Sequence, residues 1–174
     1  MFKKLHKTAA VATEFEQQLR SVSLRVTQPR LAVLTAVNTH PHSDTDSIIA
    51  SVRQKLPGVS HQAVYDSLHA LTEAALLRKI QPSGLVARYE SRVGDNHHHV
   101  VCRSCRRIDD IDCAVGDPPC MTPSDDHGFV IDETEVIHWG LCPDCAAAVQ
   151  ADADVIADPV TARTTSKIKI KNDS

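Results

Sequence analysis

The first 90 residues place apolar side chains at spacings of three and four between clusters of turn residues, which predicts a series of short helices. A short helix is expected over residues 14–23. The next begins after Thr27, whose hydroxyl can cap a helix that carries Pro29 in its first turn. A third is expected to start at Ser43 or Asp44, because acidic residues favour the positive end of a helix. The faces that the last two helices are expected to bury are Leu31, Leu34 and Val37, and Ile48, Ile49, Val52 and Leu56.

A further helix, capped by Ser60, has two chemically different faces. Its apolar face is Val64, Leu68, Leu71 and Ala75, and its opposite face is Gln62, Tyr65, Asp66 and His69. Beyond it, residues 76–81 and 85–90 flank the turn residues Pro82-Ser83-Gly84, which predicts a β-hairpin. Helices followed by a two-stranded wing predict a winged helix-turn-helix.

The second half has shorter apolar runs, which predict a small mixed sheet. The expected strands are Val100-Val101, Ile108 to Ile111, Phe129 to Ile131 and Val136 to Trp139. The Pro-rich stretch 114–123 is not expected to form a long helix. Residues 1–13 and 151–174 are polar and without period, and are expected to be flexible tails. The fold class is therefore α+β, with a winged-helix domain over 14–90 and a small α/β domain over 91–150.

The charge of the chain divides at the same point. The first 90 residues hold 11 Lys and Arg against 7 Asp and Glu, a net charge of +4, and the remainder holds 8 against 15, a net charge of −7. A basic first module suits a polyanion such as double-stranded DNA, and an acidic second module suits cations. With 42% hydrophobic and 24% charged residues, the composition excludes collagen, a coiled coil and global disorder.

Apolar runs are too short for a transmembrane helix, and the Lys-rich start is not followed by the apolar region of a signal peptide. The protein is therefore expected in the cytoplasm, without a membrane partner. In that reducing compartment, six cysteines are more often metal ligands or redox thiols than disulfides.

Four of the cysteines form two Cys-x-x-Cys motifs, Cys102 with Cys105 and Cys142 with Cys145, separated by 36 residues. Four thiolates satisfy a tetrahedral zinc ion, and each motif supplies two of them from one tight turn. One structural zinc per subunit is expected, with a redox pair as the alternative. For the remaining cysteines, Cys113 and Cys120, both inert thiols and a redox or metal role stay open.

Histidines form the second cluster. On a strand, His97 and His99 point to one face, so that they can chelate one ion. Glu90 and Asp110 offer oxygen ligands, and His42 lies at the start of a helix in the first half. Imidazole and carboxylate suit Fe(II), Mn(II) or Zn(II). Three other histidines are expected to be ordinary residues, namely His61, His69 and His127.

Three sequence segments resemble the ferric uptake regulator family of bacterial metal-dependent repressors. They are Leu24 to Arg30, Val59 to Tyr65, and His97 to Cys105, and the resemblance covers roughly residues 14–146. It implies a homodimer that binds operator DNA. It also implies a regulatory site for Fe(II) or Mn(II) formed by His42, Glu90, His97, His99 and Asp110, with His40 as the rival of His42.

The family's additional metal site is only partly retained. Thr134 and Asn96 stand where histidines are expected, and His98 and Asp117 could preserve part of it.

Within the family, Tyr65-Asp66, Asp110, Cys113 and Cys120 are most similar to the actinobacterial peroxide-sensing branch associated with catalase-peroxidase genes. This implies control of oxidative-stress or iron genes. Peroxide-sensing members carry aspartate where iron-sensing members tend to carry glutamate, and Asp110 rather than Asp109 falls at that position. The resemblance implies that peroxide oxidises His97 or His99 when Fe(II) is bound. Oxidation of thiols is the rival mechanism.

DNA recognition is expected from the polar face of the helix after Ser60. The ring of Tyr65 can pack on a thymine methyl group, with Gln62 beside it. Arg20, Arg25 and Arg30 are expected to contact phosphates or enter the minor groove. The alternative for Tyr65 is packing under the wing.

Two other functions compete with a repressor. A metalloenzyme could use the histidines and a carboxylate as a catalytic face, although the sequence contains no phosphate loop, nucleophile elbow or HExxH motif. A zinc-stabilised interaction module would leave the basic first half unexplained.

Overall fold

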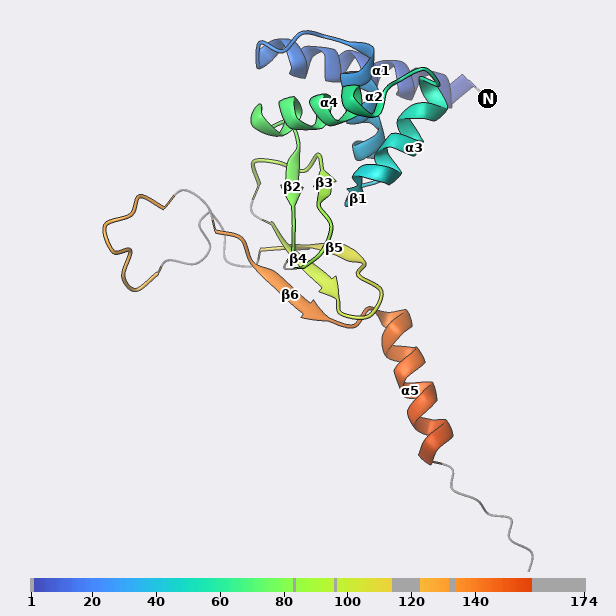
Figure 1. The fold of residues 1–174 in the computed structure, drawn as a ribbon, viewed down its shortest axis with the longest axis vertical. Helices are drawn as coiled ribbons and strands as arrows, with labels where there is room; N and C mark the ends of the chain where they lie inside the picture. The colour runs from blue at the N-terminus through green and yellow to red at the C-terminus, as the bar shows by residue number, and fades with distance from the viewer. Residues whose placement is uncertain (1, 83, 96, 114–122, 132–133, 158–174) are drawn as a thin grey trace, which may run out of the picture.

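The computed structural model describes residues 2–82, 84–95, 97–113, 123–131 and 134–157, with only the backbone for 2–10 and 151–157. The four N-terminal helices lie together at one end, the wing lies beneath them, and a second sheet follows (Figure 1). The expected α+β class with a winged helix is confirmed.

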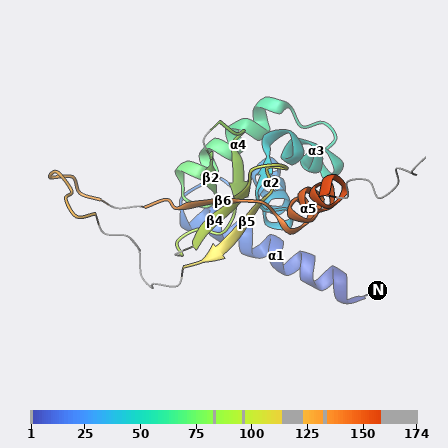
Figure 2. The ribbon, with the colours of Figure 1, turned by 90° about the horizontal axis from the view of Figure 1, so that it is seen from below.

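The first helix, α1 (Phe2–Ser21), is longer than the sequence pattern predicts, and its N-terminal end extends beyond the other helices (Figure 2). Residues 2–13, expected to belong to a flexible tail, therefore form a helix. Val11, Phe15 and Leu19 recur every four residues and pack against the core, with Phe15 and Leu19 buried. This spacing places them on one helical face.

The predicted caps Thr27 and Ser60, and Asp44 at one of the two predicted helix starts, cap the next helices. Thr27 Oγ1 accepts from the backbone of Arg30 at α2 (Gln28–Thr39), and Asp44 Oδ1 accepts from Ser47 at α3 (Thr45–Lys55). Ser60 Oγ caps α4 (His61–Glu73) in the same way. Of the predicted apolar faces, the buried members are Leu34, Val37, Ile48, Ile49, Val52, Val64, Leu68 and Leu71. Ala75 is exposed, because the helix ends at Glu73.

The wing has three strands where the sequence predicted two. β2 (Arg78–Ile80) and β3 (Arg88–Glu90) form the expected antiparallel hairpin. β1 (Ser43–Asp44) adds to the other edge of β3, opposite Tyr89 and Arg88. This short strand brings the residue that precedes it, His42, beside the end of β3.

The second sheet is mixed, as predicted. β4 (His97–Cys102) lies between β5 (Ile108–Asp112), which is antiparallel to it, and β6 (Ile137–Gly140), which is parallel. The expected strand over Phe129 to Ile131 is wrong: these residues have no strand partner in the described part of the chain.

A final helix, α5 (Pro143–Ala157), projects away from this sheet (Figure 1). Residues 151–157, predicted as tail, therefore belong to a helix. Predictions for Asn96, Asp117, Cys120 and residues 158–174 fall outside the described residues. In the described part of the chain, no helix has the length and apolarity that crossing a membrane requires.

Candidate metal centres and DNA-binding face

The two Cys-x-x-Cys motifs meet at one point. Cys102 ends β4 and Cys105 lies in the turn after it, whereas Cys142 and Cys145 lie at the start of α5; the four Sγ atoms are within 4.8 Å of one another. Cys105 Sγ and Cys142 Sγ are 3.6 Å apart. Sulfurs bound at about 2.3 Å to a tetrahedral zinc would be about 3.8 Å apart, so the donor set and its spacing fit that ion.

Backbone groups around the cluster favour a thiolate. The N–H groups of Cys142 and Cys105 lower the pKa of Cys102 to about 6. The backbone N–H of Arg107 acts in the same direction on Cys105, but the neighbouring sulfurs of Cys102 and Cys142 raise the pKa of Cys105 to about 11. Thiolates this close repel one another, so the four cysteines ionise together only when a bound cation offsets that repulsion.

A second cluster lies between the two modules. Ligand atoms of His42, Glu90, His99 and Asp110 are within 4.8 Å of one another. His42 Nε2 is 2.8 Å from Asp110 Oδ1 and 3.1 Å from Glu90 Oε2. His99 Nε2 is 3.3 Å from the same Glu90 oxygen. His42 and Glu90 belong to the winged-helix module, whereas His99 and Asp110 face each other on β4 and β5.

His97 borders this four-residue cluster without joining its 4.8 Å group. Its side chain is fully buried, and its Nε2 lies 3.1 Å from the other carboxylate oxygen of Glu90, Oε1. On its far side, His97 Nδ1 lies 2.7 Å from Asp95 Oδ1, and Arg92 contacts the second oxygen of Asp95. Sequence reasoning missed Asp95 and Arg92; their position just before the histidines is the only signal that could have found them.

Interactions within this cluster favour the ionised form of Glu90 and the protonated form of His42. Burial alone would raise the pKa of Glu90, but hydrogen bonds from His42 and His99 lower it to about 2. Burial alone would lower the pKa of His42, yet Glu90 and the charge of Asp110 raise it above its usual value. Two imidazoles and two carboxylates converging on one point form a donor set suited to Fe(II), Mn(II) or Zn(II).

The choice of His42 over His40 follows the local backbone. His42 has a φ of +58°, and its N–H donates to the carbonyl of Tyr89 on β3. This contact turns its ring toward Glu90, whereas His40 ends α2 and is exposed.

Strand alternation places Asp109 and His98 on the opposite faces of their strands from Asp110 and His97, as expected. Asp109 pairs with Arg107 on the opposite face from Asp110. His98 lies across the sheet from His97, with its ring 6.2 Å from that of His138.

The polar face of α4 is exposed. Tyr65 is 48% exposed, which contradicts packing under the wing. Gln62 is exposed as well, and its amide donates to Asp66 one turn later.

The three arginines lie in two different settings. Arg25 and Arg30 line a depression with Ala63 of α4, and Arg30 donates to the carbonyl of Arg25. Arg20 lies at the end of α1, where it pairs with Glu16 at 2.9 Å.

The chain is similar to known proteins of one family. Residues 21–138 match the model of the ferric uptake regulator family. The transcriptional regulator FurA of Mycobacterium tuberculosis is 68% identical over 133 residues, which cover 76% of this chain and 90% of that protein. Ferric uptake regulation protein 2 of Mycolicibacterium fortuitum is 63% identical over 142 residues, covering 80% and 97%.

Solved structures agree on the fold. The ferric uptake regulator of Helicobacter pylori has a TM-score of 0.59 at 19% identity, covering 79% of this chain and 93% of that one. The peroxide stress regulator of Campylobacter jejuni has a TM-score of 0.53 at 21% identity, covering 83% and 98%. The family model and the relatives named as transcriptional regulators, rather than the fold, decide against the metalloenzyme alternative. The chain belongs to the ferric uptake regulator family, as a metal-dependent transcriptional regulator.

Proposed function

We propose that this protein represses transcription by binding operator DNA when Fe(II) or Mn(II) occupies the site formed by His42, Glu90, His97, His99 and Asp110. One observation carries the proposal: ligand atoms from both modules lie within 4.8 Å of one another. An ion held there would fix the angle between the winged helix and the second sheet, and with it the placement of α4.

Two carboxylates from different modules support a coupling between the ion and the module angle. Glu90 and Asp110 come from different modules, and both approach His42 within about hydrogen-bond distance. Two carboxylates this close repel each other unless positive charge lies between them. A divalent cation supplies that charge, so its removal weakens the contact between the modules.

Zinc in the Cys102, Cys105, Cys142 and Cys145 site is proposed to be structural, with one ion per subunit. It would join the end of β4 to the start of α5 across a gap of 36 residues. A closed four-thiolate site contributes folding free energy and leaves no position for substrate.

The active form is proposed to be a homodimer that binds through the second module. Apolar side chains there are exposed in the single chain: Phe129, Val130, Ile131, Leu141 and Val149. Such residues are typical of a surface that a partner covers. Two copies would present two α4 helices to double-stranded DNA.

DNA recognition is assigned to Tyr65 and Gln62 on the exposed face of α4, with Arg20, Arg25 and Arg30 on phosphates. The depression that Arg25 and Arg30 share with α4 supports their contribution to the same surface. Arg20 must exchange its ion pair with Glu16 for a phosphate; an exposed pair of this kind contributes only up to about 1 kcal/mol.

Peroxide is proposed as a signal in addition to iron. Fe(II) bound at the site would activate hydrogen peroxide, and the two electrons that reduce the peroxide come from the imidazole that is oxidised. His97 and His99 are the buried imidazoles beside it, and one of them takes up one oxygen atom of peroxide while the other oxygen leaves as water. An oxidised imidazole is a poor ligand, so the ion and then the DNA are released. Catalase-peroxidase and other oxidative-stress genes are the proposed targets.

A mobility shift assay with DNA from upstream of the protein's own gene tests the repressor proposal. The wild-type protein is expected to shift the DNA with Mn(II) or anaerobic Fe(II), and not after chelation of the regulatory ion. His42→Ala is expected to abolish the metal response, whereas His40→Ala keeps it. Equal DNA binding by wild type and His42→Ala with and without metal would refute the proposal.

A further inference from the structure

The segment that joins the two modules carries a chain of charged contacts leading into the candidate regulatory site. Arg92 Nε is 2.5 Å from Asp95 Oδ2, and the other oxygen, Asp95 Oδ1, is 2.7 Å from His97 Nδ1. His97 Nε2 then faces Glu90 Oε1 at 3.1 Å. Gly94, with a φ of +76°, makes the turn that brings Arg92 and Asp95 together.

The same arginine also reaches the second sheet. Its Nη2 is 2.7 Å from Asp112 Oδ1, and its Nη1 is 3.6 Å from Asp110 Oδ2. Asp110 therefore has its two oxygens in different surroundings, with Oδ1 toward His42 and Oδ2 toward Arg92. One guanidinium thus contacts Asp110 directly and His97 through Asp95.

We propose that Arg92 and Asp95 are positioning residues that orient His97 and Asp110 for the regulatory metal. The inference rests on the proposed function of that site. An imidazole that binds metal through Nε2 must carry its proton on Nδ1, and a carboxylate that accepts this proton fixes both the tautomer and the ring plane. Asp95 is placed to do this for His97, and Arg92 holds Asp95 in turn.

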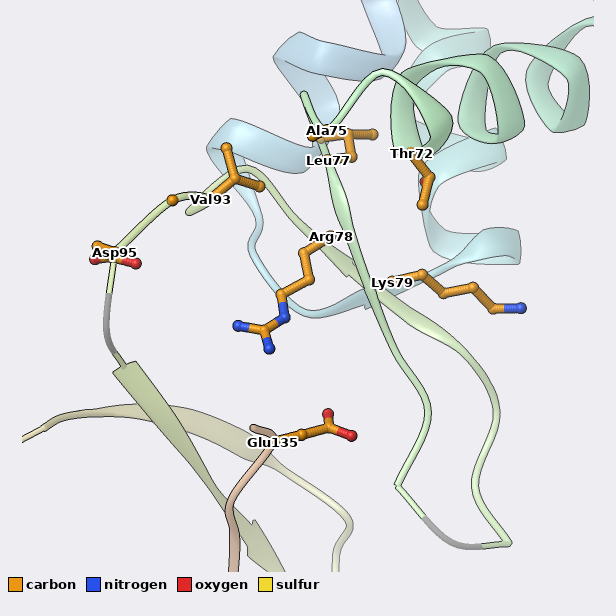
Figure 3. Close-up of a pocket in the computed structure, with 9 residues that line it drawn as sticks. Thr72, Ala75, Leu77, Arg78, Lys79, Val93, Asp95 and Glu135 are labelled. Atoms are coloured by element: carbon orange, nitrogen blue, oxygen red, sulfur yellow. The ribbon is translucent and has the colours of Figure 1, made fainter. Parts of the chain in front are cut away.

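The exposure of the pair argues against a role in the core. The side chains of Arg92 and Asp95 are 37% and 41% exposed, whereas that of His97 is fully buried. Asp95 lies at the edge of an open cleft, on the segment leading into β4; Arg78 of β2 and Glu135, just before β6, also line this cleft (Figure 3). Exposed ion pairs contribute little to stability, so a purely structural role predicts small effects on everything measured.

The first test is the affinity of the zinc-loaded dimer for Mn(II), measured by electron paramagnetic resonance of the free ion. Asp95→Asn, which keeps shape and removes charge, is expected to weaken binding by roughly 10- to 100-fold, as loss of such a partner does at other metal sites. Arg92→Gln is expected to weaken it in the same direction. Arg107→Gln is the matched control, since Arg107, just before β5, pairs at 2.8 Å with Asp109, which strand alternation places on the opposite face of β5 from Asp110. Its affinity is expected to stay within twofold.

The second readout is the tautomer of His97 in the same protein without Mn(II), observed by nitrogen-15 NMR of the ring. The wild type is expected to carry a proton on Nδ1, and Asp95→Asn is expected to lose this preference. Unchanged Mn(II) affinity and an unchanged ring spectrum in Asp95→Asn or Arg92→Gln would overturn the inference. So would an equal loss in Arg107→Gln.

A ligand variant separates this inference from the function on which it rests. If His99→Ala binds Mn(II) as tightly as wild type, the regulatory site itself is wrong. If His99→Ala loses binding while Asp95→Asn and Arg92→Gln retain it, the site stands and only the positioning role fails.

Discussion

Replacing Tyr65 with alanine removes the largest exposed side chain on the polar face of α4. A tyrosine can bury 150–250 Å², and at 48% exposure about 100 Å² of this one is left for DNA to cover. At about 25 cal/mol per Å² this area corresponds to about 2.5 kcal/mol. The value agrees with the range of about 1–3 kcal/mol for a good base contact, or roughly 5- to 150-fold in affinity.

The assay is a fluorescence titration of operator DNA with the Mn(II)-loaded protein, repeated with a random duplex of the same length. Tyr65→Ala is expected to weaken operator binding by that factor and binding to random DNA by less than twofold. His69→Ala is the matched control, because its side chain is 73% exposed one turn further along the same helix. Calorimetry is expected to show folding free energies within about 1 kcal/mol of wild type for both variants, as for most exposed positions.

Equal losses on operator and random DNA would contradict base recognition by Tyr65 and would make it a general contact. A normal operator affinity in Tyr65→Ala, with His69→Ala impaired, would move the recognition surface toward the end of α4.

Three further predictions concern the zinc site, the phosphate contacts and a helix cap. Cys142→Ser is expected to lose zinc and to dissociate the dimer, because zinc binding contributes on the order of 10 kcal/mol in small zinc domains. A zinc assay and light scattering compare this variant with the control Cys113→Ser. A Cys142→Ser protein that stays dimeric and keeps its zinc would refute the structural role of the site. Arg25→Ala is expected to reduce the slope of log affinity against log salt by about one, and an unchanged slope in the titration would exclude a phosphate contact. Asp44→Ala removes the cap of α3 and is expected to lower the unfolding free energy by about 1 kcal/mol in a denaturant titration. Asp46→Ala is the control, and an equal loss in that variant would show that helix charge rather than capping matters.

Much of the winged helix could be predicted because its signals are local. The apolar residues at helical spacing and the caps Thr27 and Ser60 each act within one turn of chain, so sequence alone carries them. The strand β1 is different. Two residues have no period, and Ser43 and Asp44 form a strand only because β3 lies beside them.

The candidate metal sites divide in the same way. Cys-x-x-Cys spacing and strand alternation are local, and the four cysteine sulfurs meet as that spacing predicts. Alternation turns His97 and His99 toward the two oxygens of Glu90, but only His99 joins the 4.8 Å group. The chain of Arg92 and Asp95 depends on how one short turn folds back on β5, which no spacing encodes. Conversely, Phe129 to Ile131 have strand-forming side chains but no neighbour in the described chain to accept their hydrogen bonds.

The exposed fractions of the histidine side chains allow a test of where peroxide oxidation begins. The side chains of His97 and His99 are 0% and 1% exposed, whereas those of His69 and His127 are 73% and 78% exposed. A freely diffusing oxidant would reach the exposed pair first. Oxidation that begins at the regulatory metal must instead modify the buried pair.

The Fe(II)-loaded and Mn(II)-loaded proteins are therefore to be treated with the same low dose of hydrogen peroxide and compared by peptide mass spectrometry and DNA release. With Fe(II), a mass gain of 16 Da is expected on His97 or His99, not on His69 or His127, together with loss of DNA. With Mn(II), neither change is expected, because this ion does not readily reduce peroxide. If DNA is released equally in both samples and only cysteines are oxidised, the thiols are the sensor. If the exposed histidines gain 16 Da first, the oxidant forms away from the site, and the buried imidazoles carry no signal.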